Sequence, residues 1–279
     1  MTRARTPAEN AQLALLLEVA GTPKPGNVDR HRDHDDLRFE HFLAGAVGSL
    51  RGLQLAEDGA PVGEAFETAV SGMADQRGGN TQFGCLLLLV PLVRAAGEGD
   101  LSRESVRAVC EATTVADAAG FYRAFEHVDV AVDDPPADVA DLDVRRGVDA
   151  VPALEERGLT LYDVLARSED DGNAAEWTSG FPRVFREAEA ILADEGAVSD
   201  RVARAFLRLL AEQEDGFVRT TSGPEAAREA RERAQACLDG EEDPEALAEE
   251  FVDRGINPGT TADLTCGAVF VALERGLPV

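Results

Sequence analysis

Hydrophobic positions recur at helical spacing along almost the whole chain. Within residues 8–20, for example, Leu13, Leu16 and Leu17 stand at i, i+3 and i+4, which places them on one face of a helix. Polar stretches between such segments predict loops over residues 21–38, 75–81, 127–140, 168–174, 214–224 and 255–260. The remaining predicted helices cover residues 39–56, 63–74, 82–96, 102–119, 160–167, 174–193, 199–213, 224–238, 243–254 and 260–275.

Strand patterns are almost absent. The one candidate is residues 127–132, where valines alternate with polar or small residues, and a single short strand cannot form a sheet. The stretch over residues 133–150 is rich in aspartate and is the only plausible domain boundary, and we interpret it as a surface loop. We therefore expect an all-α, multi-helix bundle of about a dozen helices, forming a single domain over residues 1–279.

Composition narrows the class of protein. Hydrophobic residues make up 44% of the chain, which favours a globular protein, but no run reaches the roughly 18 apolar residues of a membrane-spanning helix. Residues 1–6 carry no apolar signal-peptide core, so we expect a cytoplasmic protein. Cys85, Cys110, Cys237 and Cys266 lack the paired spacing of a zinc or redox motif and are expected to be reduced and mostly buried.

The charge of the chain restricts its partners. A net charge of −26, from 53 acidic and 27 basic residues, disfavours nucleic acid and anionic membranes. Near-absence of lysine beside abundant Asp and Glu suggests a cytoplasm of very high salt, as in a salt-in halophile, because screening there reduces self-repulsion. This hypothesis predicts a loss of structure in low salt. No pattern in the sequence indicates an oligomeric state.

The only lysine of the chain, Lys24, lies between two prolines in the loop over residues 21–38. Proline restricts φ and biases the residue before it towards extended geometry, so we expect a stiff segment that presents Lys24 to a ligand. Carboxylates of the same loop can hold Mg²⁺ while Lys24 or the arginines contact phosphate. The loop therefore suggests a magnesium–nucleotide site, with an acidic solvated turn as the alternative. His31 and His34 lack a third soft ligand, so we do not expect zinc.

Two later loops each lead into a predicted helix. In residues 76–84, paired glycines allow a ligand to approach the backbone and the helix start offers N–H groups to an anion, whereas Asn80 and Thr81 could be helix caps. In residues 257–265, Asp263 falls in the first turn of the last helix, where the helix dipole favours a carboxylate. Alternatively, Asp263 faces a pocket shared with the first two loops.

Together, the three loops resemble the motifs of the triphosphoribosyl-dephospho-CoA synthase family. The resemblance extends over nearly the whole chain and implies an all-helical fold. Its motifs, in chain order, are Thr-Pro-Lys-Pro-Gly at residues 22–26 followed by Val-Asp-Arg at residues 28–30 and His-Arg-Asp at residues 31–33, Gly-Gly-Asn-Thr-Gln-Phe-Gly at residues 78–84, and Asn-Pro-Gly-Thr-Thr-Ala-Asp-Leu-Thr at residues 257–265.

The resemblance implies transfer of the triphosphoribosyl group of ATP to the 2′-hydroxyl of 3′-dephospho-CoA, with release of adenine. Breaking the glycosidic bond builds oxocarbenium character at the ribose, so a carboxylate beside the sugar can stabilise that charge or deprotonate the attacking hydroxyl. Our candidates for this catalytic role are Asp29, Asp33 and Asp263.

The resemblance also implies ligands for the nucleotide and its metal ion. Lys24 would neutralise triphosphate oxygens, while Asn80 and Thr81 would orient the phosphates or the ribose. The full nucleotide-binding set is Lys24, Asn27, Arg30, Gly79, Asn80 and Thr81, and the Mg²⁺ ligands are Asp33 and Asp35.

The chain departs from the family pattern at two points. Gln82 and Phe83 stand where the family has His-Lys, which removes two groups suited to phosphate contact or proton transfer. Phe83 could instead stack on a base or on the pantetheine arm. Residues 171–173 read Asp-Gly-Asn where the family has Asp-Thr-Asn. Two alternatives therefore stay open: a divergent homologue that acts on another nucleotide or cofactor precursor, and a non-catalytic nucleotide-binding protein.

Several other residues have a structural interpretation. Trp177, Phe181 and Phe185 have i, i+4, i+8 spacing and are expected in the core. Cys85 and Cys266 lie in apolar helix starts and are expected to lack a neighbouring base, so we do not expect a thiol nucleophile.

Overall fold

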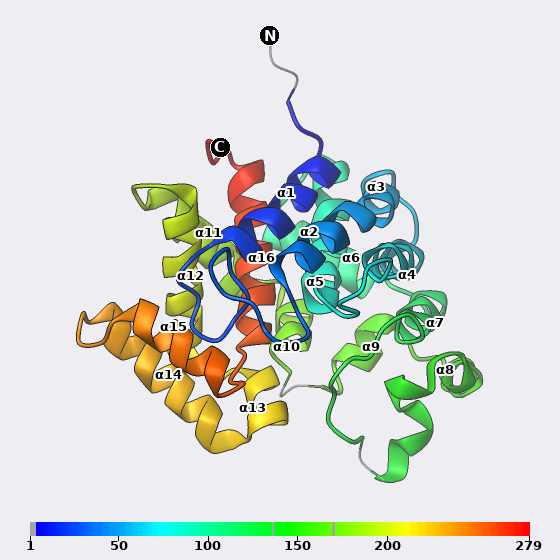
Figure 1. Ribbon diagram of the computed structural model, residues 1–279. Coiled ribbons are helices and arrows are strands. Elements are labelled where there is room, and N and C mark those ends of the chain that lie inside the picture. Colours follow the sequence, from blue (N-terminus) through cyan, green and yellow to red (C-terminus); the bar gives the residue numbers. More distant parts are fainter. Residues whose placement is uncertain (1–3, 136, 169–170) are drawn as a thin grey trace.

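The computed structural model describes residues 4–135, 137–168 and 171–279, and these residues form an all-α fold. The described chain contains sixteen α-helices, two short 3₁₀ helices and no strand (Figure 1). Its one isolated β-bridge joins Asp29 and Arg32 within a loop. The prediction of an all-α, multi-helix bundle is therefore confirmed. The bounds are α1 (Pro7–Ala20), α2 (Phe39–Gly48), α3 (Leu50–Glu57), α4 (Val62–Met73), α5 (Phe83–Gly97), α6 (Arg103–Glu111), α7 (Val115–Ala124), η1 (Ala137–Leu142), η2 (Val144–Ala150), α8 (Val151–Arg157), α9 (Leu161–Leu165), α10 (Gly172–Ser179), α11 (Pro182–Ala193), α12 (Val198–Glu212), α13 (Gly216–Ser222), α14 (Pro224–Leu238), α15 (Pro244–Asp253) and α16 (Gly259–Glu274).

Three predicted helices are each two helices in the structure: residues 39–56, 102–119 and 174–193. The second divides because Thr114 forms a capping box with a residue one turn later and starts α7 afresh. The third divides because the chain turns through left-handed geometry at residue 181 (φ 57°) and restarts with Pro182 at the first position of α11. Local cap chemistry therefore overrides a continuous hydrophobic spacing.

The remaining differences are short elements that the spacing did not reveal. The predicted loop over residues 214–224 contains α13, and the interval over residues 133–150 contains η1 and η2, with α8 directly after it. Residues 127–132 form no strand. Elements of five to seven residues carry too few hydrophobic positions for a period to be recognised.

Two helices form the centre of the molecule. α16 crosses the middle of the fold, and α1, α5, α11 and α12 pack against it (Figure 1). Every residue over 264–273 in α16 and over 85–93 in α5 is buried, as expected for helices that are apolar on all sides. Trp177, Phe181 and Phe185 belong to the same core, as predicted, and the Trp177 indole donates to the Leu87 carbonyl at 2.8 Å.

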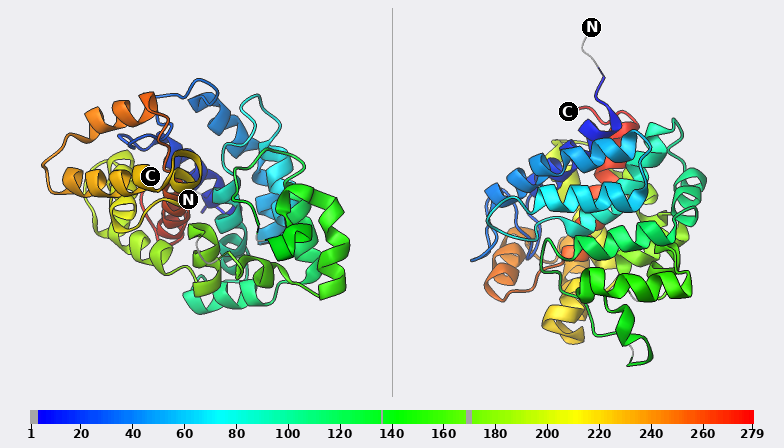
Figure 2. Two further views of the ribbon diagram at one scale, coloured as in Figure 1. Left: turned by 90° about the horizontal axis from the view of Figure 1, so that it is seen from below. Right: turned by 90° about the vertical axis from the view of Figure 1, so that its right-hand side faces the viewer.

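The elements around the centre separate into two sides. α12 to α15 enclose a second hydrophobic cluster that includes Phe206 and Phe251. In Figure 1 and in the view from below in Figure 2, α14 and α15 lie on the side opposite α7 to α9. None of the helices within the described ranges is long and apolar enough to cross a membrane. All four cysteines are free thiols, and three of them are buried.

Candidate functional site

The lone lysine is completely buried. Lys24 is 0% exposed, its Nζ pairs with the carboxylate of Glu18, and the same Nζ donates to Asn27 Oδ1 at 2.9 Å. The ring of Phe206 lies beneath it, with the centroid 5.8 Å from Nζ. The expectation that the loop presents Lys24 to a ligand is therefore wrong in this conformation. A charge removed from water needs a partner, and Glu18, in the last turn of α1, supplies it.

Glu18 is a residue that the sequence analysis missed. It is 1% exposed, and burial raises the pKa of its carboxyl above the ordinary value, while the charge and hydrogen bond of Lys24 act in the opposite direction. Glu18 lies three residues after Leu15 on the buried face of α1. The hydrophobic spacing did not reveal this face, because Leu13, Leu16 and Leu17, which it placed together on one side of the helix, are only half-buried.

Asp29 organises the first loop from within. It is 0% exposed and accepts hydrogen bonds from the Thr22 hydroxyl (2.8 Å), the His31 N–H (2.8 Å) and the Arg32 guanidinium (3.0 Å). The backbone N–H of Lys24 also donates to it, at 3.3 Å. Since donors surround both oxygens, the visible role of Asp29 is to hold the loop in shape.

The first and third loops meet directly. Asn27 Nδ2 donates to Asn257 Oδ1 at 2.9 Å. Gly26, with φ 75°, lies so close to the third loop that an added Cβ would be 1.8 Å from the Ile256 carbonyl oxygen. Only glycine allows this approach.

Asp263 lies where three helices begin. It is the fifth residue of α16 and lies in the second turn, so the expectation that it falls in the first turn is wrong. Its Oδ2 accepts from Asn173 Nδ2 of α10 at 2.8 Å, and its Oδ1 accepts from Cys85 Sγ of α5 at 3.2 Å. A Cβ on Gly84 would lie 1.9 Å from Oδ2, so the glycine at the end of the second motif makes room for the carboxylate. The third loop thus contacts both the first and the second loop, and a pocket shared by all three stays a prediction.

The surroundings of Asp263 change its chemistry. Burial raises the pKa of this carboxyl to about 7 against the lowering effect of the Asn173 and Cys85 hydrogen bonds, and the negative charges of Glu18 and Asp215 raise it further. A carboxyl with a pKa near neutrality can accept and return a proton under physiological conditions. The catalytic role of Asp263 stays a prediction, and its raised pKa is compatible with that role.

Asn173 and the two central cysteines complete the contacts around Asp263. Asn173 is 8% exposed, and its Oδ1 has no hydrogen-bond partner among the described residues. The expectation that Cys85 lacks a neighbouring base is wrong, because Asp263 accepts its S–H. A hydrogen bond with Cys266 and burial raise the pKa of Cys85 well above the ordinary value, and burial raises the pKa of Cys266. Both thiols are thereby kept in the neutral form, which is a poor nucleophile.

The second loop is braced by its own side chains. Gln76 donates to the Gly79 carbonyl at 2.6 Å and accepts from the Gly78 N–H at 2.5 Å, and Asn80 Oδ1 accepts from the Phe83 N–H at 3.2 Å. Asn80 thus contacts the helix start directly, which was the structural interpretation of this residue. Thr81 Oγ1 is buried without a partner in the described chain.

Gln82 and Phe83, the two residues of the first departure from the family pattern, both point inward. Phe83 is 5% exposed and packs in an aromatic cluster with Phe66, Phe121 and Phe125, so its ring does not face a ligand. Gln82 is 2% exposed; its Nε2 donates to a backbone carbonyl of α1 at 3.4 Å, while its Oε1 has no partner among the described residues.

The remaining predicted residues of the first loop lie at the surface. Arg30, Asp33 and Asp35 are exposed, and Asp33 Oδ1 accepts from the Phe39 N–H at 2.7 Å at the start of α2. Across the described ranges, no group of three or more His, Cys, Asp or Glu side chains could hold a metal ion. Mg²⁺ usually combines one or two carboxylates with phosphate oxygens and water. Asp33 and Asp35 match those one or two carboxylates, and their role as Mg²⁺ ligands stays a prediction.

Helix starts gather around Asp263. Asp215 accepts from the N–H of Val218, at the start of α13, at 3.0 Å and from the N–H and hydroxyl of Thr261, both at 2.7 Å. An added Cβ on Gly172, the first residue of α10, would lie 2.7 Å from Thr260 Cγ2. The amino ends of α5, α10 and α16 therefore surround one region, where helix dipoles favour anionic groups such as phosphates.

Comparisons with known proteins identify relatives of this chain. A family model described as ATP:dephospho-CoA triphosphoribosyl transferase matches residues 4–278. The chain is 28% identical over 280 residues to the 2-(5″-triphosphoribosyl)-3′-dephosphocoenzyme-A synthase of Pectobacterium atrosepticum, covering 90% of this chain and 83% of that protein. A crystal structure from Archaeoglobus fulgidus, described as a triphosphoribosyl-dephospho-CoA synthase, superposes with a TM-score of 0.70 at 26% identity and covers 86% of this chain and 100% of that one.

The helical fold, the polar loops at the helix starts and these matches define a transferase. More specifically, the chain belongs to the ATP:dephospho-CoA triphosphoribosyl transferase family, which the three loop motifs indicated.

Proposed function

We propose that Asp263 carries the proton transfer in a reaction that moves the triphosphoribosyl group of ATP to the 2′-hydroxyl of 3′-dephospho-CoA. The bond between C1′ of ATP and N9 of adenine breaks, and the acceptor oxygen forms the new bond to C1′. The hydroxyl proton passes to Asp263, and adenine leaves after taking up a proton. The observation that supports this role is the raised pKa, about 7, of a carboxyl between three helix starts.

The nucleotide is proposed to bind against the loop ends that surround Asp263. Asn27, Arg30, Gly79, Asn80 and Thr81 remain our contacts for the ribose and phosphates. Because Lys24 is buried with Glu18, we assign it to the internal charge balance of the site in this conformation. ATP would enter with Mg²⁺, whose charge neutralises phosphate oxygens, and Asp33 and Asp35 would add carboxylate ligands.

Composition supports a proposal for the cellular setting and the partners. A reducing cytoplasm suits four free cysteines, and a net charge of −26 disfavours nucleic acid as a partner.

Adenine release from MgATP, measured by chromatography in molar KCl with and without 3′-dephospho-CoA, tests this function. We expect acceptor-dependent adenine, and Asp263→Asn should lower kcat by about 100-fold or more, the usual effect of losing a general base. ATP should still raise the melting temperature of Asp263→Asn, which shows that binding is intact. Wild-type turnover in the variant would remove Asp263 from the chemistry.

The buried positions of Gln82 and Phe83 leave the acceptor as the part of the reaction to test separately. Adenine release that depends on a different hydroxyl-bearing cofactor precursor, and not on 3′-dephospho-CoA, would indicate a divergent homologue. ATP-dependent stabilisation without any adenine would indicate a nucleotide-binding protein.

A further inference from the structure

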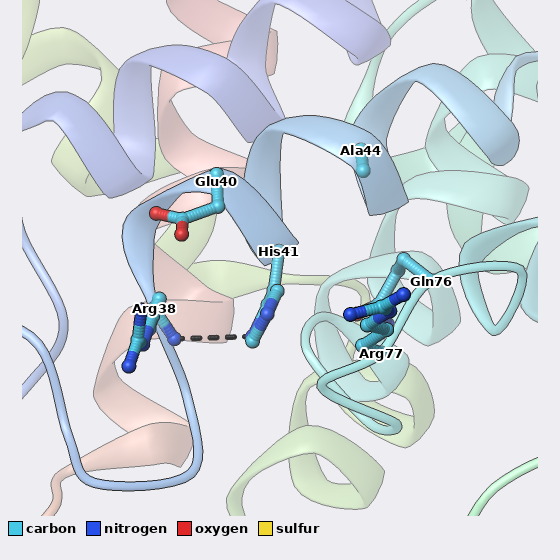
Figure 3. A pocket seen from close by; sticks show the side chains of 6 residues that line it. All are labelled: Arg38, Glu40, His41, Ala44, Gln76 and Arg77. Carbon is cyan, nitrogen blue, oxygen red and sulfur yellow. Dashed lines mark hydrogen bonds between the residues drawn. The ribbon is translucent and has the colours of Figure 1, made fainter.

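A cavity of about 700 Å³ lies between the start of α2 and the second loop. Figure 3 shows the side chains that line it: Arg38, Glu40, His41, Ala44, Gln76 and Arg77. Arg38 immediately precedes α2, His41 is in its first turn, and Arg77 comes from the loop that continues into the second motif. The cavity therefore joins two loops that the sequence analysis singled out, through side chains that it did not assign.

The two arginines of this cavity lack carboxylate partners. Within the described part of the chain, neither the Arg38 nor the Arg77 guanidinium makes an ion pair, although many other arginines, such as Arg94 and Arg145, do so. Other arginines, such as Arg228, are also without an ion pair in the described chain, but Arg38 and Arg77 line the same cavity. Arginine presents several N–H donors in a planar fork that matches phosphate oxygens.

His41 adds a third donor between the arginines. Its Nδ1 accepts the backbone N–H of Arg38 at 3.2 Å, so the neutral ring carries its proton on Nε2. In Figure 3 the ring points into the gap between Arg38 and Arg77, whereas the carboxylate of Glu40 points away from Arg77. Glu40 is the only acidic residue among those that line the cavity.

The second loop lies directly on this face of α2. A Cβ on Gly78 would lie 2.5 Å from His41 Nδ1, and a Cβ on Gly45, one turn further along α2, would lie 2.6 Å from Thr81 Oγ1. Thr81 Oγ1 and Gln82 Oε1 are buried without partners among the described residues. Polar groups thus continue along the loop from the arginines towards Gly84, which adjoins Asp263.

We propose that Arg38, His41 and Arg77 form a subsite for the polyphosphate chain of a substrate. This proposal rests on the proposed function and adds the residues that recognise a phosphoanhydride. The triphosphate of ATP and the diphosphate of dephospho-CoA share this chemistry. The subsite holds its ligand through guanidinium and imidazole N–H groups, and Glu40 limits its affinity through like-charge repulsion.

Isothermal titration calorimetry with inorganic tripolyphosphate tests the subsite independently of turnover. We expect binding to the wild type, a rise in Kd of about tenfold or more for the double variant Arg38→Gln/Arg77→Gln, and a lower Kd for Glu40→Gln. Arg228→Gln is the matched control, because Arg228 is an exposed arginine on α14 with no ion pair in the described chain. An unchanged Kd in the double variant, equal weakening in the control, or no binding to the wild type would overturn the proposal.

Steady-state kinetics then identifies the source of the phosphates. A rise in KM for MgATP alone in the double variant assigns the subsite to the triphosphate, and a rise for 3′-dephospho-CoA alone assigns it to the diphosphate. Unchanged KM values for both substrates would reject the subsite. If the wild type bound tripolyphosphate but released no adenine, the proposed function would fail while the anion site remained.

Discussion

The protonation of Asp263 affects both the stability of the fold and the proposed reaction. Its pKa is about 7 in the folded protein, against an ordinary value of 3.8 for an aspartate in water. The folded state therefore keeps a proton that the unfolded chain releases between about pH 4 and 7, so this group lowers the free energy of unfolding as the pH rises through that window. The carboxylate form that the proposed proton transfer needs is thus the form that burial disfavours.

This coupling predicts the behaviour of Asp263→Asn. Asparagine cannot lose a proton, so the variant should be more stable than the wild type at pH 8 and should approach it below pH 4. Each tenfold difference in proton affinity between the folded and unfolded states contributes about 1.4 kcal/mol to that gap. Urea denaturation across this pH range, in molar KCl, measures the difference in the free energy of unfolding. A difference that does not vary with pH would contradict the raised pKa.

The pair of Glu18 and Lys24 leads to a second prediction at the residue scale. Glu18→Gln leaves the Lys24 ammonium buried without its counter-charge and should lower the free energy of unfolding by about 3–5 kcal/mol. The double variant Glu18→Gln/Lys24→Met removes both charges and should recover most of that loss. The denaturant midpoints of the single and the double variant are compared in high salt. A double variant as unstable as Glu18→Gln would show that the charges of Glu18 and Lys24 do not neutralise each other.

At the scale of elements, the start of α5 is shaped by a glycine. A Cβ at Gly84 would lie 1.9 Å from Asp263 Oδ2 and 2.7 Å from Asn173 Nδ2, so α5 can approach α10 and α16 this closely only without a side chain there. The last glycine of the second motif therefore has a packing role that positions the carboxylate.

Gly84→Ala is expected to displace Asp263 and lower kcat by about tenfold or more, since misplacement by about 1 Å can reduce rates by about 100-fold. Gly216→Ala is the matched control, because its added Cβ would meet Thr260 Oγ1 at an ordinary 3.6 Å. Adenine release and melting temperature are measured for both variants. Full activity in Gly84→Ala would show that the carboxylate tolerates the shift.

The boundaries of a helix could be predicted where a local start or stop signal coincides with the end of the hydrophobic spacing. α14 matches its predicted bounds, residues 224–238, because Pro224 starts it and its hydrophobic face is continuous. The predicted helix over residues 102–119 was wrong because a capping box at Thr114 interrupts a hydrophobic spacing that does not itself change.

At the scale of the whole molecule, charge is the dominant feature. Ion pairs such as Arg233 with Glu250 stabilise the surface, but each exposed pair is worth only about 0–1 kcal/mol and weakens in salt. The repulsion behind a net charge of −26 acts over the entire surface and is reduced when the screening length falls to about 3 Å at 1 M salt. Screening should therefore favour the folded state.

We expect the melting temperature to rise by roughly 10 °C or more between dilute buffer and molar KCl, the equivalent of several kcal/mol for a chain of this size. Circular dichroism at a series of KCl concentrations measures this change, with NaCl as a second salt to separate screening from specific ion binding. A melting temperature that does not change with salt would reject adaptation to a high-salt cytoplasm.

The sequence by itself determined the all-α fold, the family and the three motif loops on which the proposed site rests, because the hydrophobic period and the motif residues are local properties of the chain. Only the tertiary structure decided the roles within the site. It buried Lys24 against Glu18, placed Asn173 on Asp263 across 90 residues and turned Phe83 into the core. These outcomes depend on which helix starts pack together, and burial then sets the charge and pKa of each group, which no local pattern contains.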